Sequence, residues 1–220
     1  MLTYNDILRK LREGEQFSFS RWGDGEWNAV LGRSGENCDG HKYFPDMGQR
    51  LKEVLESKPD YYLGMQLLAL RLNQEDKEFQ RLYQMNEWGD AEIIYNEVIG
   101  GGLDDLLDTI RCINYHNERD VIVVAPQHIL DADIVSLSYA CQEVNKKDAW
   151  LDYENVKLGL WGMIEGSEII LYCCGMMAGV LIDDFKHAGV TQIDIGSAFD
   201  PLCGVYSRSK YKQLHEQGKL

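Results

Sequence analysis

The chain has 220 residues, of which 45% are hydrophobic and 26% charged, a composition that excludes wholesale disorder. Acidic residues outnumber basic ones 36 to 22, so the formal net charge is −14. Binding along nucleic acid or an anionic membrane needs an excess of cations, so this charge argues against both as general properties of the surface. The net charge does not exclude a local basic site. The length predicts a single domain over residues 1–220.

Neither a targeting segment nor a membrane span is expected. The longest uncharged apolar run, Ile169–Ile182, is too short to cross a bilayer and contains two glycines. The six cysteines are scattered without a C-x-x-C pair, which favours reduced thiols over a disulfide or zinc framework. We therefore expect a cytoplasmic protein. Its oligomeric state stays open, with a homodimer as one option.

The first third of the chain predicts two helices and two strands. The apolar residues after Thr3 recur at helical spacing, whereas Phe17 and Phe19 alternate with serines, which is typical of a half-buried strand. In chain order we expect a helix from Thr3 to Gly14, a strand at Gln16–Arg21, a loop at Gly32–Asp46, a helix at Met47–Ser57 and a strand at Tyr61–Met65.

The middle of the chain contains one strongly apolar strand signal. Asp120–Pro126 (DVIVVAP) is a β-branched run bounded by a charge and a proline, as in a buried parallel strand. Around it we expect a helix at Glu75–Glu87, a short strand at Ala91–Asn96, a helix at Leu103–Ile113, a weaker strand at Ile134–Ser138 and a helix at Tyr153–Met163.

The last third contains the clearest unit, a strand, a helix and a second strand separated by glycines. The strand Glu168–Cys174 ends at Gly175, the helix Met176–His187 follows, and the strand Thr191–Ile195 comes after a further glycine. This order is a βαβ crossover. The sequence therefore predicts an α/β fold with a mostly parallel sheet flanked by helices.

The hexapeptide RWGDGE, at the end of the first predicted strand, is the first candidate site. In an extended segment Asp24 and Glu26 project to one side and can share a divalent cation such as Mg²⁺ or Mn²⁺. Gly23 and Gly25 would let the backbone approach a ligand, and Arg21 suits a phosphate contact. The alternative is a polar hairpin turn, because Asp-Gly is a common turn dipeptide.

Further candidates follow the predicted strands of the last third. Gly175 begins a helix whose free N–H groups can bind a phosphate, although the glycine could equally serve close packing. Asp194 and Asp200 lie at or after a strand end, where a carboxylate can face a ligand hydroxyl. The Asp194–Gly196 segment also resembles a methyltransferase cofactor loop, but it lies too late in the chain.

Two weaker candidates are basic or titratable. His128 follows the apolar strand, and we expect it to lie at a solvated loop position. The other is a cationic and aromatic cluster near the C-terminus, interpreted either as a polyanion site or as an exposed terminal helix: Tyr206, Arg208, Lys210, Tyr211 and Lys212.

The phrase Phe19–Glu26 (FSRWGDGE) resembles the R-x-G-D-G-E signature of GT-D-type glycosyltransferases, first catalogued as a bacterial domain of unknown function. Weaker parts of the resemblance are Tyr95-Asn96, Val121–Pro126, Ile170–Phe185 and Asp194–Gly196. The resemblance implies a Rossmann-like fold, a nucleotide-sugar donor that is usually a UDP-sugar, and binding of Mn²⁺ or Mg²⁺ by Asp24 and Glu26.

The expected activity is metal-dependent transfer of a sugar to an acceptor hydroxyl. The acceptor is a glycan or glycoprotein, or a hydroxymethylated base of viral DNA. Asp200, Glu97 and His128 are candidates for the base that deprotonates it. Two alternatives stay open: a Rossmann-like S-adenosylmethionine-dependent methyltransferase, and a nucleotide-sugar-binding protein without catalytic activity.

Overall fold

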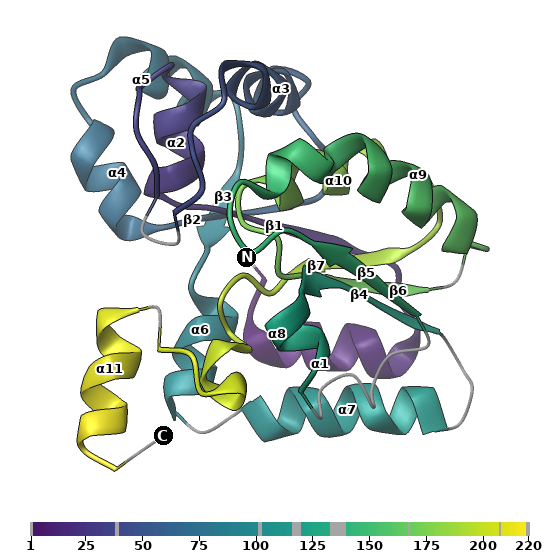
Figure 1. Cartoon of the computed structure of the whole chain (residues 1–220). Coiled ribbons are helices and arrows are strands. Elements are labelled where there is room, and N and C mark those ends of the chain that lie inside the picture. The colour runs from purple at the N-terminus through teal and green to yellow at the C-terminus, as the bar shows by residue number, and fades with distance from the viewer. Residues whose placement is uncertain are drawn as a thin grey trace.

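The computed structural model describes residues 2–37, 40–100, 103–115, 120–132, 140–166, 168–206 and 208–218. Its centre is a seven-stranded sheet in the order β3-β2-β1-β7-β6-β4-β5, in which every pair of neighbours is parallel (Figure 1). The strands are β1 (Ser18–Trp22), β2 (Tyr62–Met65), β3 (Trp88–Asp90), β4 (Val121–Pro126), β5 (Ala140–Val144), β6 (Ile169–Tyr172) and β7 (Thr191–Asp194).

Helices cover both faces of the sheet, which confirms the predicted fold class (Figure 1). One face carries α1 and α7, and the other carries α3, α9 and α10. The helices are α1 (Tyr4–Glu13), α2 (Asp24–Val30), α3 (Pro45–Glu56), α4 (Leu67–Asn73), α5 (Lys77–Gln84), α6 (Ile93–Gly100), α7 (Leu103–Tyr115), α8 (Gln127–Leu130), α9 (Tyr153–Met163), α10 (Met177–Asp184) and α11 (Ser209–Glu216). Among the described residues, no helix is long and apolar enough to cross a membrane.

Local sequence signals explain where several elements begin and end. Thr3 and Asp6 form a reciprocal capping box at the start of α1, and Gly14 ends the helix in a left-handed conformation. All residues of β4 are buried, as expected for a strand covered on both faces. The β6–α10–β7 unit is the predicted crossover, with Gly175 at its first turn. These elements carry the two core clusters on the two faces of the sheet.

The predicted strand at Ala91–Asn96 is wrong. The strand β3 ends at Asp90, whose Oδ1 accepts the N–H of Glu92 and turns the chain into α6. Ile93 and Ile94 are β-branched but bury their side chains from this helix, in the cluster shared with α1 and α7. Tertiary packing therefore overrides their strand propensity. The other strand expected weakly, Ile134–Ser138, lies outside the described residues.

A close contact between α2 and α3 gives a stability prediction. A Cβ at Gly48 would overlap the backbone carbonyl of Ala29, which cannot move unless the two helices separate. Helix propensity favours alanine over glycine by about 1 kcal/mol, but overpacking costs roughly 1–3 kcal/mol. We expect Gly48→Ala to lower the free energy of unfolding by about 1–2 kcal/mol in urea titrations. Gln49→Ala, an exposed change on the same helix, should stay within about 0.5 kcal/mol.

Candidate functional site

The site forms where β1 and β7 lie side by side in the middle of the sheet. From β1 the chain moves outward to β2, and it returns to β7 from the other half through β6, so the strand order reverses between these two neighbours. In open α/β sheets, ligands bind at the carboxyl ends of the strands at such a switch point. Arg21 lies at the carboxyl end of β1 and Asp194 at that of β7.

Arg21 and Asp194 join the two strand ends. The backbone N–H of Arg21 donates to Asp194 Oδ2 at 3.2 Å. Its guanidinium donates from Nε to the carbonyl of Ala91 at 2.8 Å and from Nη1 to that of Ile195 at 3.3 Å. Two of the three guanidinium nitrogens are thus occupied within the fold. Arg21 therefore links the carboxyl ends of β1 and β7 and places a positive charge close to Asp194.

Asp194 is buried, and this has an electrostatic consequence. Burial raises its pKa to about 7, and the negative charge of Glu26 acts in the same direction, against the opposing effect of Arg21. The folded protein therefore keeps this proton up to about pH 7, whereas an unfolded chain releases it near 3.8. Between those values the folded state binds more protons, so this group makes stability fall as pH rises.

We therefore predict a pH-dependent stability difference between the wild type and Asp194→Asn. Relative to the variant, the wild type should lose stability between pH 5 and pH 7, on the order of 1 kcal/mol per pH unit, and change little above that range. Urea unfolding of both proteins at several pH values measures this, and taking the difference cancels the titration of all other groups. A difference independent of pH would show that Asp194 does not have a raised pKa.

Asp24 and Glu26 lie on a helix and not on an extended segment, so that part of the prediction is wrong. Asp24 is the first residue of α2, and Glu26 Oε2 accepts the N–H of Gly23 at 2.7 Å. A carboxylate three residues past the helix cap is a recognised way to satisfy free N–H groups, and it starts the helix directly at the end of β1. Burial raises the pKa of Glu26, and the charge of Asp24 adds to this effect.

The two carboxylates fit a divalent cation only in part. Among the described residues, no group of three or more His, Cys, Asp or Glu side chains is arranged to hold a metal ion. Mg²⁺ and Mn²⁺, however, accept one or two protein carboxylates when substrate phosphates and water complete the coordination. A cation would also offset the burial of negative charge at Glu26. By residue type the pair therefore suits an ion that arrives with a phosphorylated ligand, but side chains two residues apart on a helix do not face each other, so the helix alone does not bring both carboxylates to one ion.

The glycines of the motif lie close to neighbouring side chains. A Cβ at Gly23 would lie 3.0 Å from Gln66 Oε1, and one at Gly25 would lie 3.3 Å from the sulfur of Met176. Both contacts are tighter than ordinary van der Waals distance. Because both atoms are at the ends of flexible side chains that can move aside, packing alone does not require glycine at either position.

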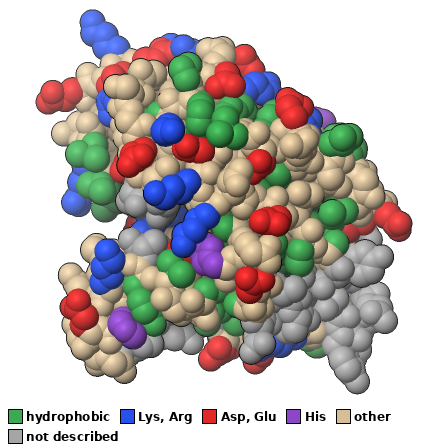
Figure 2. Space-filling view, viewed as in Figure 1, with side chains coloured by type: hydrophobic (Ala, Val, Ile, Leu, Met, Phe, Trp, Pro, Cys, Tyr) green, Lys and Arg blue, Asp and Glu red, His purple; other side chains and the backbone are tan. Residues whose placement is uncertain are grey.

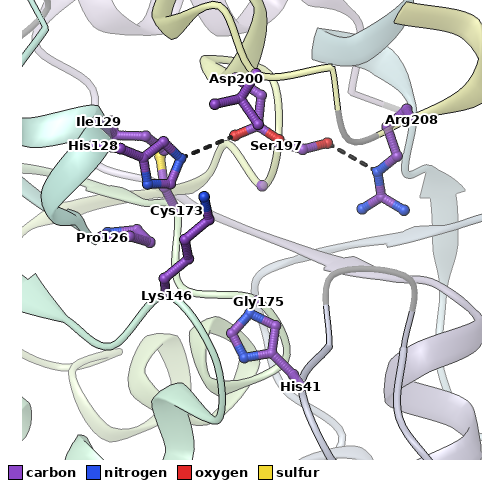
Figure 3. Close-up of a pocket in the computed structure, with 12 residues that line it drawn as sticks. His41, Pro126, His128, Ile129, Lys146, Cys173, Gly175, Ser197, Asp200 and Arg208 are labelled. Carbon is purple, nitrogen blue, oxygen red and sulfur yellow. Dashed lines mark hydrogen bonds and ion pairs between the residues drawn. The ribbon is translucent and has the colours of Figure 1, made fainter. Parts of the chain in front are cut away.

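A cavity of about 190 Å³ lies over the other half of this edge (Figure 3). Gly175, whose φ is +60°, lies on its wall next to His41, and Gly196 borders it from the end of β7. It is lined by His41, Pro126, His128, Ile129, Lys146, Cys173, Gly175, Gly196, Ser197, Asp200, Val205 and Arg208. Gly175 and Asp200 thus both line this cavity, whereas Asp24 and Glu26 are not part of the lining.

Two of the three candidate bases lie close together in the cavity. His128 Nε2, on α8, lies 4.0 Å from Oδ1 of the buried Asp200 (Figure 3). Burial lowers the pKa of His128, and the positive charge of Lys146 lowers it further, which favours a neutral imidazole near pH 7. The reading of His128 as a solvated loop residue is therefore wrong, because it follows β4 directly into the cavity. The third candidate, Glu97, has a side chain outside the described part of the structure.

Sequence reasoning missed three residues of this cavity. His41 comes from a loop and accepts the N–H of Ala149 at its Nδ1, while Lys146 follows β5. Ser197 accepts a hydrogen bond of 3.0 Å from Arg208 Nε. The signal for Lys146 was a strand end, but the sequence analysis predicted no strand at Ala140–Val144, so the lysine was not placed at this edge.

The C-terminal basic cluster does not act as one unit. Arg208 turns into the cavity, Tyr211 is buried, and Lys210 and Lys212 are exposed on α11. The second interpretation, an exposed terminal helix, therefore holds for the lysines alone. No disulfide joins any two of the described cysteines, which are Cys112, Cys141, Cys173, Cys174 and Cys203.

Architecture and switch point together define a Rossmann-like α/β fold. The chain is similar to two structures of the domain of unknown function 1792, one substituted with selenomethionine and one described as having "a distinct glycosyltransferase fold". The TM-scores are 0.65 and 0.64, the identity is 16% for both, and the alignments cover 99% of this chain and 81% of each of those chains.

A third similar structure is described as a new glycosyltransferase of the same domain type from Streptococcus sanguinis. Its TM-score is 0.64 at 19% identity, over 99% of this chain and 84% of that one. Neither a family model nor a curated protein matches the sequence. At these identities the likeness establishes the fold, which is the fold that the resemblance of FSRWGDGE to GT-D-type enzymes predicted.

Proposed function

We propose that this protein is a glycosyltransferase that moves a sugar from a nucleotide-sugar donor, most naturally a UDP-sugar, to an acceptor hydroxyl. The observation that carries the proposal is the position of Asp24 and Glu26. They lie at the end of β1, beside Arg21 and Asp194 at the switch point of a fold that the similar structures share over 99% of this chain.

The donor diphosphate is assigned to the α2 end of the site. Asp24 and Glu26 would hold Mn²⁺ or Mg²⁺ there, together with phosphate oxygens of the donor. A bound divalent ion supplies Lewis-acid neutralisation of the leaving diphosphate. The residues themselves fix this end in place: Glu26 caps α2, and Arg21 ties β1 to the carbonyl of Ile195.

The acceptor is assigned to the cavity beside it. His128 and Asp200 face the same space, and a neutral imidazole can accept the proton of a hydroxyl that attacks the sugar. Glycans, glycoproteins and hydroxymethylated bases of viral DNA all offer such hydroxyls. The net charge of −14 makes duplex DNA the less favourable of these.

The methyltransferase alternative loses its main support. Its proposed cofactor loop depended on Gly196, whose φ is +58°. A Cβ there would overlap Nη1 of Arg21, so the glycine is already required by the arginine. A binding protein without catalytic activity differs from an enzyme only in turnover, and that is measured directly.

The test is to incubate the purified protein and Mn²⁺ with UDP-, GDP-, CMP- and dTDP-sugars and to quantify the released nucleotide by chromatography. Slow hydrolysis to water reports donor activation before any acceptor is known. We expect release from one nucleotide class, and loss of release when EDTA is added. Binding of S-adenosylmethionine with no sugar nucleotide consumed or bound would contradict the proposal. Binding of a sugar nucleotide without release under any acceptor would leave the non-catalytic alternative.

A further inference from the structure

The cavity over β4, β6 and β7 has a charge opposite to that of the chain. Lys146 and Arg208 are cationic lining residues, and Asp200 is the one carboxylate among those that line it. In the whole sequence acids outnumber bases 36 to 22. On the face in Figure 2, basic side chains and a histidine gather beside the hollow between α11 and the rest of the fold. The cavity is therefore a local basic site of the kind that the net charge does not exclude.

The two cations approach the cavity from different segments. Lys146 follows β5 and extends toward the His128–Asp200 pair, while Arg208 lies beyond Ser197, to which it donates from Nε (Figure 3). Lys146 makes no ion pair with any residue that the structure describes. Its charge is close enough to His128 to affect the imidazole. Within the described part of the chain nothing neutralises this charge, so the lysine can face an anion in the cavity.

The remaining walls define the size of the occupant. Pro126, Ile129, Cys173 and Val205 are apolar lining residues. The cavity of about 190 Å³ has room for one sugar ring. Because it opens to solvent, the rest of a longer acceptor could extend out of it.

His128 supplies a place for a hydroxyl. The 4.0 Å between Nε2 and Asp200 Oδ1 is too long for a direct hydrogen bond. A ring hydroxyl can donate its single proton to Nε2 at about 2.8 Å. The carboxylate of Asp200 also only accepts, so it can take a hydrogen bond from a neighbouring hydroxyl of the same ring. Lys146 and Arg208 line the same cavity.

From these observations we infer that the cavity is the acceptor subsite, and that it takes a sugar unit carrying an anionic group, either a phosphate or a carboxylate. Lys146 and Arg208 bind the anion, His128 Nε2 accepts the hydrogen bond of the reacting hydroxyl, and Asp200 accepts one from a neighbouring hydroxyl. The inference rests on the proposed glycosyltransferase function. In the reaction, the acceptor oxygen bonds to the anomeric carbon of the donor as the bond from that carbon to the diphosphate breaks. The nucleoside diphosphate leaves with the electron pair, and the acceptor proton passes to His128 Nε2.

The same cations are not needed for the donor. Asp24 and Glu26 are not in the cavity lining, whereas Gly196 is, and Arg21 lies directly behind it. The two ends of the site therefore meet at the β1–β7 switch point without sharing Lys146 or Arg208. Donor and acceptor should consequently bind at the same time, and not in competition.

Isothermal titration calorimetry with simple sugars tests this inference. The probes are glucose 6-phosphate, glucuronic acid and uncharged glucose at constant ionic strength, with and without saturating UDP and Mn²⁺. The proteins are the wild type, Lys146→Gln, Arg208→Gln and the matched control Lys77→Gln, an exposed lysine on α5 outside the cavity lining. Melting temperatures verify that each variant is folded.

We expect both anionic sugars to bind at least about tenfold more tightly than glucose, because they add charge-assisted hydrogen bonds with Lys146 and Arg208 that glucose cannot make. Lys146→Gln and Arg208→Gln should each weaken that binding about tenfold, and Lys77→Gln should leave it unchanged. Binding should persist with UDP and Mn²⁺ present. Preference for phosphate over carboxylate, or the reverse, identifies the group.

Three results would overturn the inference. The first is equal binding of glucose and the anionic sugars, or no binding of any of them. The second is unchanged affinity in both cavity variants. The third is competition by UDP together with weaker UDP binding in Lys146→Gln, which would assign the cations to the donor. Tight binding of the anionic sugars by a protein that binds no sugar nucleotide would support the anionic subsite and overturn the glycosyltransferase proposal instead.

Discussion

Asp24→Asn and Glu26→Gln are each expected to lower metal-stimulated sugar transfer by about a hundred- to a thousandfold. Each change removes one of two carboxylates available to a cation at this end of the site. Glu26→Gln should also leave the fold intact, because an amide oxygen can still accept the N–H of Gly23 and because the wild-type carboxylate is buried at a cost. Initial rates of nucleotide release across a Mn²⁺ titration measure the effect.

The control for this experiment is Asp104→Asn, which removes one exposed carboxylate from the first turn of α7. It changes the net charge by the same amount and should leave both rate and metal dependence unaltered. Full metal-stimulated transfer by both site variants would show that Asp24 and Glu26 do not form the metal site. If Glu26→Gln lost metal-stimulated transfer and also had a lower melting temperature, the capping role of Glu26 alone would explain the loss.

His128→Gln is expected to lower transfer by about a hundred- to ten-thousandfold while leaving donor binding unchanged. Asp200→Asn should also slow transfer, because the carboxylate lies 4.0 Å from the imidazole and stabilises it once it is protonated. The exposed His187→Gln serves as control. Single-turnover rates, together with donor dissociation constants, separate the chemical step from binding.

The pH profile adds a test that a merely structural histidine would not pass. A protonated imidazole cannot accept a proton, so transfer should fall as the pH drops through the pKa of His128. Burial and Lys146 lower this pKa, which places the decline below the ordinary range for histidine. Lys146→Gln removes one of the two causes and should move the decline to higher pH. An identical profile in wild type and His128→Gln would exclude this residue as the base.

Strong local patterns in the sequence were enough to predict the fold. β4 is a continuous β-branched run that is buried on both faces, and the glycine-bounded β6–α10–β7 unit is a crossover as expected. The position of RWGDGE at a strand end was also correct. The helical conformation at the start of α2 was not predicted, because Gly-Asp-Gly-Glu fits a turn, an extended segment and a capped helix equally well. The cap contact from Glu26 to Gly23 decides among them.

The candidate site was only partly accessible from sequence, because its halves are far apart in the chain. His41, Lys146 and Arg208 come from three separate loops, and no spacing relates them. Asp200 and His128 were both considered, but only the sheet order, in which β6 alone separates β4 from β7, brings the segments after these two strands together. Such a meeting depends on strand order, which a pattern of local periodicities does not contain.

The most direct test of the account is a thermal-shift panel of UDP-, GDP-, CMP- and dTDP-sugars, with Mn²⁺ or EDTA, on the wild type and Asp24→Asn. A ligand at 100 times its dissociation constant stabilises by about 2.7 kcal/mol, which corresponds to roughly 5–10 °C for a chain of this size. The account predicts such a shift for one nucleotide class, most naturally UDP, that requires Mn²⁺ and is lost in Asp24→Asn. No shift with any sugar nucleotide, or a shift unaffected by both EDTA and the variant, would contradict it.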